Sequence, residues 1–458
     1  MAELTHTRAA GGEGVLAEIV RDQKHGAARG IASVCSAHPL VLRAAFEQAL
    51  ADGSSVLVES TSNQVNQEGG YTGVTPVEFV AFVERLAAES ELPGERVVLG
   101  GDHLGPHPWA ALGAGPAMER AREMVRQYVR AGYEKIHLDA SMRLADDPAG
   151  ALADAAAAER TADLAVVAEA AAAERPDGER RPVYVIGTEV PTPGGQAGEH
   201  EGPVPTRAED AQRALDLTRA AFVRRGLEPA WPRVLAQVVQ PGVEFGDDVV
   251  YRYRREAASH LRAFAERQER LVFEAHSTDY QGEAELRALV EDHFAVLKVG
   301  PELTFALREA VFALEAIERE LLARRAPQRL SGLREALERA MRADPRHWKA
   351  YYGEADEDTL WLRRAFSLSD RTRYYWPVPE VQEAVKRLIA NLDAERVPAG
   401  LLRQYLPAAG AAEPMAPADG NSARLARLHV RRVLARYARA CGVVASLGSL
   451  ASRASLPL

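Results

Sequence analysis

Several short stretches of the sequence end in side chains that can bind metal ions or transfer protons. Asp102 and His103 stand side by side in GGDHLGPHPW, and His276 lies in FEAHSTD. Glu189 ends the stretch YVIGTE. Two imidazoles and a carboxylate from separate stretches suit a catalytic divalent metal with an open coordination position. His103, His276 and Glu189 are therefore candidate metal ligands, although each histidine taken singly could equally be a hydrogen-bonded residue at a strand end.

Eight short apolar runs alternate with segments of helical periodicity over the first two thirds of the chain. Each run is rich in β-branched residues and has the length of a strand buried on both faces. Repeated strand–helix units imply parallel pairing with right-handed crossovers, and eight of them close a (β/α)8 TIM barrel. A doubly wound open sheet is the alternative, but no GxGxxG fingerprint follows the first run. The predicted strands are GIASVCS (30–36), SVLVEST (55–61), RVVLGGD (96–102), KIHLDAS (135–141), VYVIGTE (183–189), RVLAQVVQ (233–240), LVFEAHS (271–277) and FAVLKVG (294–300).

The C-terminal ends of these predicted strands are polar, and this is where a TIM barrel has its active site. In KIHLDAS, alternation places Lys135, His137, Asp139 and Ser141 on one face of the strand. A polar face inside a barrel is costly unless its groups pair with one another or hold a ligand. We therefore expect metal or substrate contacts at these ends.

The alternation of strands and helices stops after residue 316. We predict a TIM-barrel catalytic domain over residues 14–316 and a helical C-terminal extension over residues 317–458. Within the extension, residues 407–422 are rich in Pro, Ala and Gly, which predicts a flexible loop. We expect the extension to pack on the barrel or on another subunit, and the protein to be a homo-oligomer.

Composition and charge exclude several classes of partner. The formal net charge of the 458 residues is −9, which argues against a nucleic-acid binder or any general binder of polyanions. The chain has no apolar stretch of about 18 residues and no signal-peptide pattern, so we expect neither a membrane protein nor a secreted one. The two cysteines, Cys35 and Cys441, are far apart in the sequence and fit a reducing, cytoplasmic setting.

A set of motifs occurs in one order along most of the chain: ESTSNQVNQEGGYTG, GGDHLGPHPW, KIHLDAS, YVIGTEVPTPGG, VVQPGVEF, FEAHSTDYQ and LKVGPELTFALREA. In these motifs the chain resembles the accessory, non-catalytic subunit family of class II tagatose-bisphosphate aldolase. The resemblance implies carbohydrate metabolism and a partner, the catalytic aldolase subunit. Some relatives are labelled tagatose-6-phosphate kinase, which the sequence does not support because it has no nucleotide-binding motif. Other members are regarded as metal-dependent 4-epimerases that interconvert fructose and tagatose.

A more distant resemblance, to the zinc-dependent class II aldolases, implies individual roles. Their aspartate–histidine pair after the third strand supplies a catalytic group and a metal ligand, which implies these roles for Asp102 and His103. The glutamate at the end of their fifth strand corresponds to Glu189. The histidine at the end of their seventh strand corresponds to His276, which implies a metal-ligand role for His276. A metal-binding histidine of that family corresponds here to Gln240. An amide oxygen is a weaker, harder ligand than imidazole, so the metal could be manganese, cobalt or nickel instead of zinc, or the site could be vestigial.

These features predict a metal-dependent, aldolase-like ketose 4-epimerase that acts on fructose and tagatose or on their phosphates. Carbon 4 lies too far from the ketone for simple proton abstraction, so a route without a redox cofactor breaks and remakes the C3–C4 bond. Asp102 would move the proton of the carbon 4 hydroxyl, and Glu189 is a second catalytic candidate. The alternative is a non-catalytic subunit that stabilises the catalytic aldolase. Candidate sugar contacts are Glu59, Asn63, Lys135, Asp139, Ser277 and Asp279.

Overall fold

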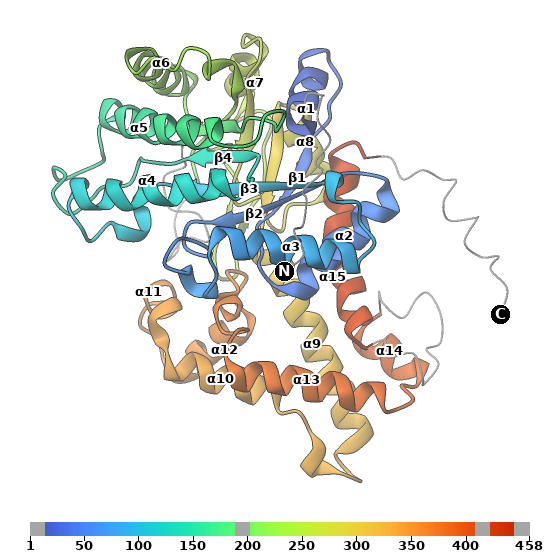
Figure 1. Ribbon diagram of the computed structural model, residues 1–458. Coiled ribbons are helices and arrows are strands. Elements are labelled where there is room, and N and C mark those ends of the chain that lie inside the picture. The colour runs from blue at the N-terminus through green and yellow to red at the C-terminus, as the bar shows by residue number, and fades with distance from the viewer. Residues whose placement is uncertain (1–13, 188–201, 408–421, 444–458) are drawn as a thin grey trace.

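A closed barrel of eight parallel strands forms the centre of the molecule (Figure 1). The computed structural model describes residues 14–187, 202–407 and 422–443. Each strand pairs with the next along the chain, and the last strand pairs with the first, so the predicted (β/α)8 fold is confirmed. The strands are β1 (Ile31–Val34), β2 (Val56–Thr61), β3 (Val97–Leu104), β4 (Lys135–Leu138), β5 (Val183–Gly187), β6 (Val234–Val238), β9 (Val272–Ala275) and β10 (Phe294–Val299).

Helices between the strands cover the outside of the barrel (Figure 1). They begin where the sequence has start signals: at α3, Thr75 and Glu78 form a capping box and Pro76 occupies the first turn. A short hairpin of β7 (Glu244–Phe245) and β8 (Val250–Tyr251), which the apolar runs did not predict, precedes α7. The barrel helices are α2 (Pro39–Asp52), α3 (Pro76–Glu89), α4 (Ala114–Arg130), α5 (Asp154–Ala173), α6 (Ala208–Arg224), α7 (Ser259–Glu266), α8 (Glu283–Glu291) and α9 (Pro301–Leu322).

The N-terminal floor of the barrel is apolar. Helix α1 (Val15–Lys24) closes this floor and buries Leu16, Ile19 and Val20 in a small cluster of inward-facing strand residues. Leu57 and Val98 belong to the same cluster. Successive side chains of a strand point to opposite faces, so every second residue from these positions also faces the interior. The inward residues nearer the mouth are polar, which places the charged part of the interior towards the C-terminal ends of the strands.

The C-terminal extension is helical, as predicted. Helix α9 runs out of the barrel into a layer of helices on one side of it, and α15 returns along the barrel beside α2 and α9 (Figure 1). The boundary that we predict at residue 316 falls inside α9, and the division into two domains stays a prediction. Residues 408–421, most of the predicted loop, lie outside the described residues. The helices are α10 (Leu333–Ala343), α11 (Lys349–Tyr352), α12 (Glu357–Phe366), α13 (Pro379–Asp393), α14 (Ala399–Tyr405) and α15 (Ser422–Ala440).

The described part of the chain contains no helix that is both long enough and apolar enough to cross a membrane. Both cysteines are free thiols. Cys441 is buried just after α15, whereas Cys35 follows β1 and faces the barrel mouth.

Candidate functional site at the barrel mouth

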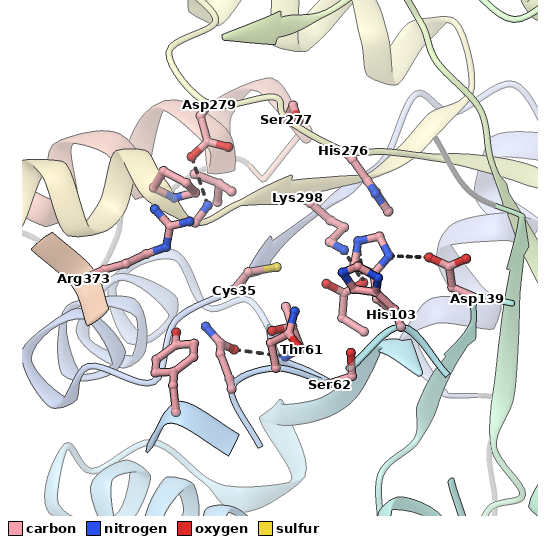
Figure 2. A pocket seen from close by; sticks show the side chains of 18 of the residues that line it. Cys35, Thr61, Ser62, His103, Asp139, His276, Ser277, Asp279, Lys298 and Arg373 are labelled. Carbon is pink, nitrogen blue, oxygen red and sulfur yellow. Dashed lines mark hydrogen bonds and ion pairs between the residues drawn. The ribbon is translucent and has the colours of Figure 1, made fainter. Parts of the chain in front are cut away.

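A pocket opens at the C-terminal ends of the barrel strands (Figure 2). Its wall comes from the ends of β1, β2, β3 and β10, the loop after β9, and a short helical turn, η7 (Arg371–Tyr374), of the C-terminal extension. The fold therefore brings together side chains that are far apart in the sequence. The predicted site residues that line this pocket are Asn63, Asp102, His103, Asp139, His276, Ser277 and Asp279.

His103 is held in an unusual backbone conformation at the end of β3. Its φ is 48°, and the pairing of β3 with β4 shifts register between Gly101 and Leu104. Such an irregularity redirects a side chain, and here it accompanies the turn of His103 into the pocket. The next glycine is required as well, because a Cβ at Gly105 would lie only 1.6 Å from the carbonyl oxygen of Asp139.

A carboxylate fixes one nitrogen of the His103 ring. Nδ1 lies 2.7 Å from Oδ2 of Asp139, so Nδ1 carries the proton and Nε2 the lone pair. Nε2 is buried, makes no hydrogen bond to any described residue, and lies 3.8 Å from Oδ1 of Asp102. Burial, more than any other influence, lowers the pKa of His103, which keeps the ring neutral.

His276 has the same arrangement on the opposite strand of the mouth. Its Nε2 lies 3.0 Å from Oε1 of Glu274, so the neutral ring carries its lone pair on Nδ1. Burial and the neighbouring Lys298 ammonium hold the pKa of His276 well below its ordinary value. The rings of His276 and His103 are 4.8 Å apart between centroids, edge to face.

Asp102 is the anionic centre of the mouth. Although burial raises the pKa of this carboxyl, His103 and Lys298 outweigh burial and hold the pKa well below its ordinary value. Lys298, from β10, forms an ion pair with Oδ1 of Asp102, and its pKa is raised because Asp102 and other acids overcome the effect of burial. Asp102 is therefore a carboxylate and Lys298 an ammonium ion at neutral pH.

His137, on β4, differs from the other two histidines because both its nitrogens are engaged. Nε2 donates a hydrogen bond to the carbonyl oxygen of Gly187 at 2.9 Å, and Nδ1 lies 3.0 Å from Oδ1 of Asp102. Burial lowers the pKa of His137, but the carboxylates of Asp102 and Glu274 raise it further, so that the net direction is upward. His137 thus positions Asp102.

The donor set fits a divalent metal ion. Asp102, His103, His137 and His276 carry potential ligand atoms that lie within 4.8 Å of one another, although both nitrogens of His137 are already engaged. His103 and His276 are each backed by a carboxylate on the far nitrogen, which is the usual outer-shell arrangement of metal-binding histidines. Two neutral imidazoles beside a carboxylate suit zinc, manganese, cobalt or nickel.

Three of the predicted site residues that the structure describes, Glu59, Lys135 and Gln240, do not reach the pocket wall. Glu59 and Lys135 are fully buried beneath it, where Lys135 forms ion pairs with Glu59 and, at 2.6 Å, with Glu274. The Oε1 atom of Gln240 accepts hydrogen bonds from two backbone amides of the following turn, at 2.8 and 3.0 Å. Glu189 lies outside the described residues.

Other predicted sugar contacts face the pocket but are also tied to the protein. Oδ1 of Asp139 accepts hydrogen bonds from Ser141, while Oδ2 faces His103, so Asp139 positions the imidazole. Oδ1 of Asp279 accepts from the backbone amides of Gly300 at 3.0 Å and Glu302 at 2.8 Å, at the start of α9. Asn63 is exposed, which leaves it accessible to a ligand.

The sequence predicts no role for several side chains of this wall, among them Lys298, Arg373 and Tyr374. Lys298 is the next inward residue after Val296 on β10, so strand alternation alone could have placed it in the barrel interior. Arg373 and Tyr374 come from η7, in an irregular part of the extension. No periodic signal in the sequence points from there to the barrel mouth.

Solved structures with a similar fold include one close likeness and several distant ones. The crystal structure of a "probable tagatose 6 phosphate kinase" from Sinorhizobium meliloti 1021 is 45% identical, with a TM-score of 0.81 over 90% of this chain and 100% of that chain. The YdjI aldolase from Escherichia coli K12 is 11% identical, with a TM-score of 0.39 over 83% and 99% of the two chains. A fructose-bisphosphate aldolase from Campylobacter jejuni is 13% identical, with a TM-score of 0.44 over 84% and 94%. At these low scores neither aldolase bears on function here.

The family comparison covers nearly the whole chain. Residues 16–442 match the model of the family described as D-tagatose-1,6-bisphosphate aldolase subunit GatZ/KbaZ-like, so the match includes the barrel, its mouth and the helical extension. The expected resemblance is confirmed, and with it a relation to carbohydrate metabolism. The chain belongs to the D-tagatose-1,6-bisphosphate aldolase subunit GatZ/KbaZ-like family.

Proposed function

We propose that the chain serves as a subunit of class II tagatose-bisphosphate aldolase and stabilises the catalytic subunit. The observation that carries this proposal is the match of residues 16–442 to a family of such aldolase subunits. An accessory subunit needs a face on which the catalytic subunit can dock. We assign this role to the helical extension.

One helix of the extension exposes apolar side chains. On α12, Trp361 is 41% exposed, Leu362 52% and Phe366 45%, and the rings of Trp361 and Phe366 lie 5.9 Å apart. Adjacent exposed aromatic and aliphatic side chains often mark a protein–protein interface. This cluster supports docking through α12.

Co-purification with a catalytic class II tagatose-bisphosphate aldolase subunit tests the proposal. We expect a complex, and a longer half-life of aldolase activity on warming when this chain is present. The double variant Trp361→Ser, Leu362→Ser should weaken both effects by at least about tenfold, since buried interface aromatics carry much of the binding energy. The exposed residue Val166 on α5 is 39% exposed, and Val166→Ser is the matched control. No complex with the wild-type chain would refute the subunit function.

The barrel mouth favours a second function, a metal-dependent 4-epimerase of ketohexoses. A subunit that acts only by docking has no need for two buried histidines whose carboxylate partners turn a lone pair towards a pocket. That paired arrangement, His103 with Asp139 and His276 with Glu274, is the observation in favour of catalysis. A divalent cation held by His103 and His276 would polarise the ketone of the sugar and stabilise an enediolate.

Asp102 is our candidate for the proton transfer. As a carboxylate it can accept the proton of the carbon 4 hydroxyl, while the C3–C4 bond breaks and its electrons pass to carbon 3 and the ketone oxygen. The products are an aldehyde and an enediolate. After the aldehyde turns over, carbon 3 attacks its other face, and Asp102 returns the proton to the new hydroxyl. Lys298 and His137 hold Asp102 in its ionised form for the first step.

Incubation of the metal-depleted protein with fructose, with and without manganese, cobalt, nickel or zinc, tests the epimerase. We expect tagatose to appear only with metal, and Asp102→Asn and His276→Ala to lower the rate by at least about a hundredfold. If no tagatose forms and no ketose or ketose phosphate is consumed, the epimerase proposal fails. The subunit proposal is tested separately, because it expects His276→Ala to stabilise the aldolase as well as the wild type does.

A further inference from the structure

Residues 367–376, which we call the mouth strap, carry the C-terminal extension across the barrel mouth. The strap is anchored by Asp370, whose Oδ1 accepts a hydrogen bond from Nε of Arg308 on α9 at 2.9 Å. Both side chains of this ion pair are buried. The Tyr280 hydroxyl, in the loop after β9, donates to the carbonyl oxygen of Leu368 at 2.6 Å. The strap is therefore held at a defined place beside the pocket.

The strap places Arg373 on the pocket wall, opposite His103 and His276 (Figure 2). The Nη1 group of Arg373 donates to the carbonyl oxygens of Ser369 and Asp370, and Nη2 donates to the Tyr374 hydroxyl at 3.2 Å. These acceptors are all uncharged. In the described ranges no carboxylate forms an ion pair with Arg373, in contrast to Arg308 of the same strap anchor. Arg373 is thus a positively charged group on the pocket wall that forms no direct ion pair with any carboxylate of the described residues.

The other positive groups near this wall are already occupied. The ammonium of Lys298 is paired with Asp102. In TIM barrels a phosphate is frequently bound by the loops after the last two strands and a helix N-terminus. Here the backbone amides at that helix start, Gly300 and Glu302, donate to the carboxylate of Asp279. Arg373 is left as the cation that can receive an anion from the pocket.

We propose that Arg373 determines substrate specificity by binding an anionic group at the end of the ketose remote from its ketone. The planar guanidinium matches the paired oxygens of a phosphate ester or a carboxylate, and a ligand anion would supply the charge that the protein does not. The ketone end would then face His103 and His276 across the pocket. This inference rests on the proposed ketose-binding function of the mouth, and it adds that the C-terminal extension completes the site.

Calorimetric titration in the presence of manganese tests the inference with three ligands: fructose, fructose 6-phosphate and fructuronate. We expect at least one of the two anionic ketoses to bind about 10- to 100-fold more tightly than fructose. A preference for the phosphate assigns the site to a phosphate ester, and a preference for fructuronate assigns it to a carboxylate. Equal binding of all three ketoses overturns the inference and leaves the ketose function standing. If none of the three binds, both proposals fail.

Variants of Arg373 make the test specific. Arg373→Met should abolish the preference for the anionic ketose while fructose binding changes by less than about threefold. Arg373→Lys should retain part of the preference, because charge remains but the two-pronged geometry is lost. Arg387→Met, at an exposed position of α13, is the matched control and should change neither affinity. If Arg373→Met keeps the preference, or loses fructose binding together with it, Arg373 is not the specificity residue.

Discussion

Two groups of ionisable side chains lie one above the other inside the barrel, and they differ in how their charges are satisfied. In the lower group, Lys135 is ion-paired with Glu59 and Glu274, and all three side chains are fully buried. In the upper group, His103 and His276 each use one nitrogen for a carboxylate and turn the other towards the pocket. The lower group is closed in the sense that its one cation is fully engaged by its own two carboxylates, whereas the upper group turns imidazole nitrogens towards the pocket.

This difference shows that polar side chains inside a barrel do not by themselves make a binding site. Glu59 and Lys135 have the residue types and strand positions of ligand contacts, yet they neutralise one another beneath the pocket. Glu274 belongs to both groups, because Oε2 faces Lys135 and Oε1 faces His276. Through Glu274, the lower group thereby fixes the orientation of His276 in the upper group. We infer a structural role for the first and a ligand-binding role for the second.

The largest effect is expected from removal of the positive charge of the lower group. Lys135→Met leaves the carboxylates of Glu59 and Glu274 without their direct ion-pair partner in a space closed to water. We expect the free energy of unfolding to fall by about 3–5 kcal/mol in urea titrations. Lys349→Met, at an exposed position of α11, is the control and should change it by less than about 0.5 kcal/mol. A loss below about 1 kcal/mol for Lys135→Met would show that the lower group is not closed.

The second prediction concerns Asp279, which lies on the pocket wall but, like the lower group, is bonded to groups of the protein itself. Burial raises the pKa of Asp279 to about 7, although backbone hydrogen bonds lower it. The folded-state pKa thus exceeds the ordinary value of 3.8, so the stabilisation is complete below about pH 4 and is lost as the pH rises through 7. Asp279→Asn, which keeps an oxygen acceptor, should match the wild type at pH 4 and be more stable at pH 8, by up to about 4 kcal/mol.

Urea unfolding of both proteins between pH 4 and pH 9 checks this expectation. Asp248→Asn, at an exposed position, serves as the control and should follow the wild-type profile. A wild-type and Asp279→Asn difference that does not change with pH would mean that Asp279 does not titrate with folding. Asp279 would then belong with the ligand-binding residues of the mouth.

The sequence predicted the barrel because its strands obey simple rules. Most of them are short runs rich in apolar residues, and on β4 alternation correctly placed Lys135 and His137 on the inward face. The aspartate–histidine pair at the C-terminal end of β3 predicted a polar mouth, and Asp102, His103 and His276 do line one pocket. These features are local or periodic, so they can be read without knowing the contacts between distant strands.

The remaining site features depend on such contacts. Oε1 of Gln240 accepts from the backbone of its own turn, which residue type alone does not indicate. The pairing of Lys298 with Asp102 joins two strands across the barrel. Arg373 reaches the mouth through an irregular segment held by a buried ion pair, far along the chain. Strand periodicity carries no information about any of these.

The difference between the two groups can be tested at the two carboxylates that accept hydrogen bonds from the pocket histidines, Asp139 and Glu274. Asp139→Asn and Glu274→Gln each replace an acceptor with an amide, which favours the tautomer with the proton on the nitrogen that faces the pocket. Each variant should therefore bind manganese or cobalt about 10- to 100-fold more weakly in calorimetric titrations. Only Glu274→Gln should also lower the free energy of unfolding, by about 1–3 kcal/mol, because Glu274 is shared with Lys135.

Ser141→Ala serves as the control, because it removes a hydrogen bond to one oxygen of Asp139 and keeps the contact of the other oxygen with His103. The Ser141 hydroxyl donates to Oδ1 at 2.7 Å, whereas His103 faces Oδ2. Its removal should leave metal affinity within about threefold of the wild type, because the contact that sets the tautomer of His103 is kept. If Asp139→Asn instead destabilises the fold as much as Glu274→Gln and leaves metal affinity unchanged, then His103 is held for structure. The upper group would then be as closed as the lower one.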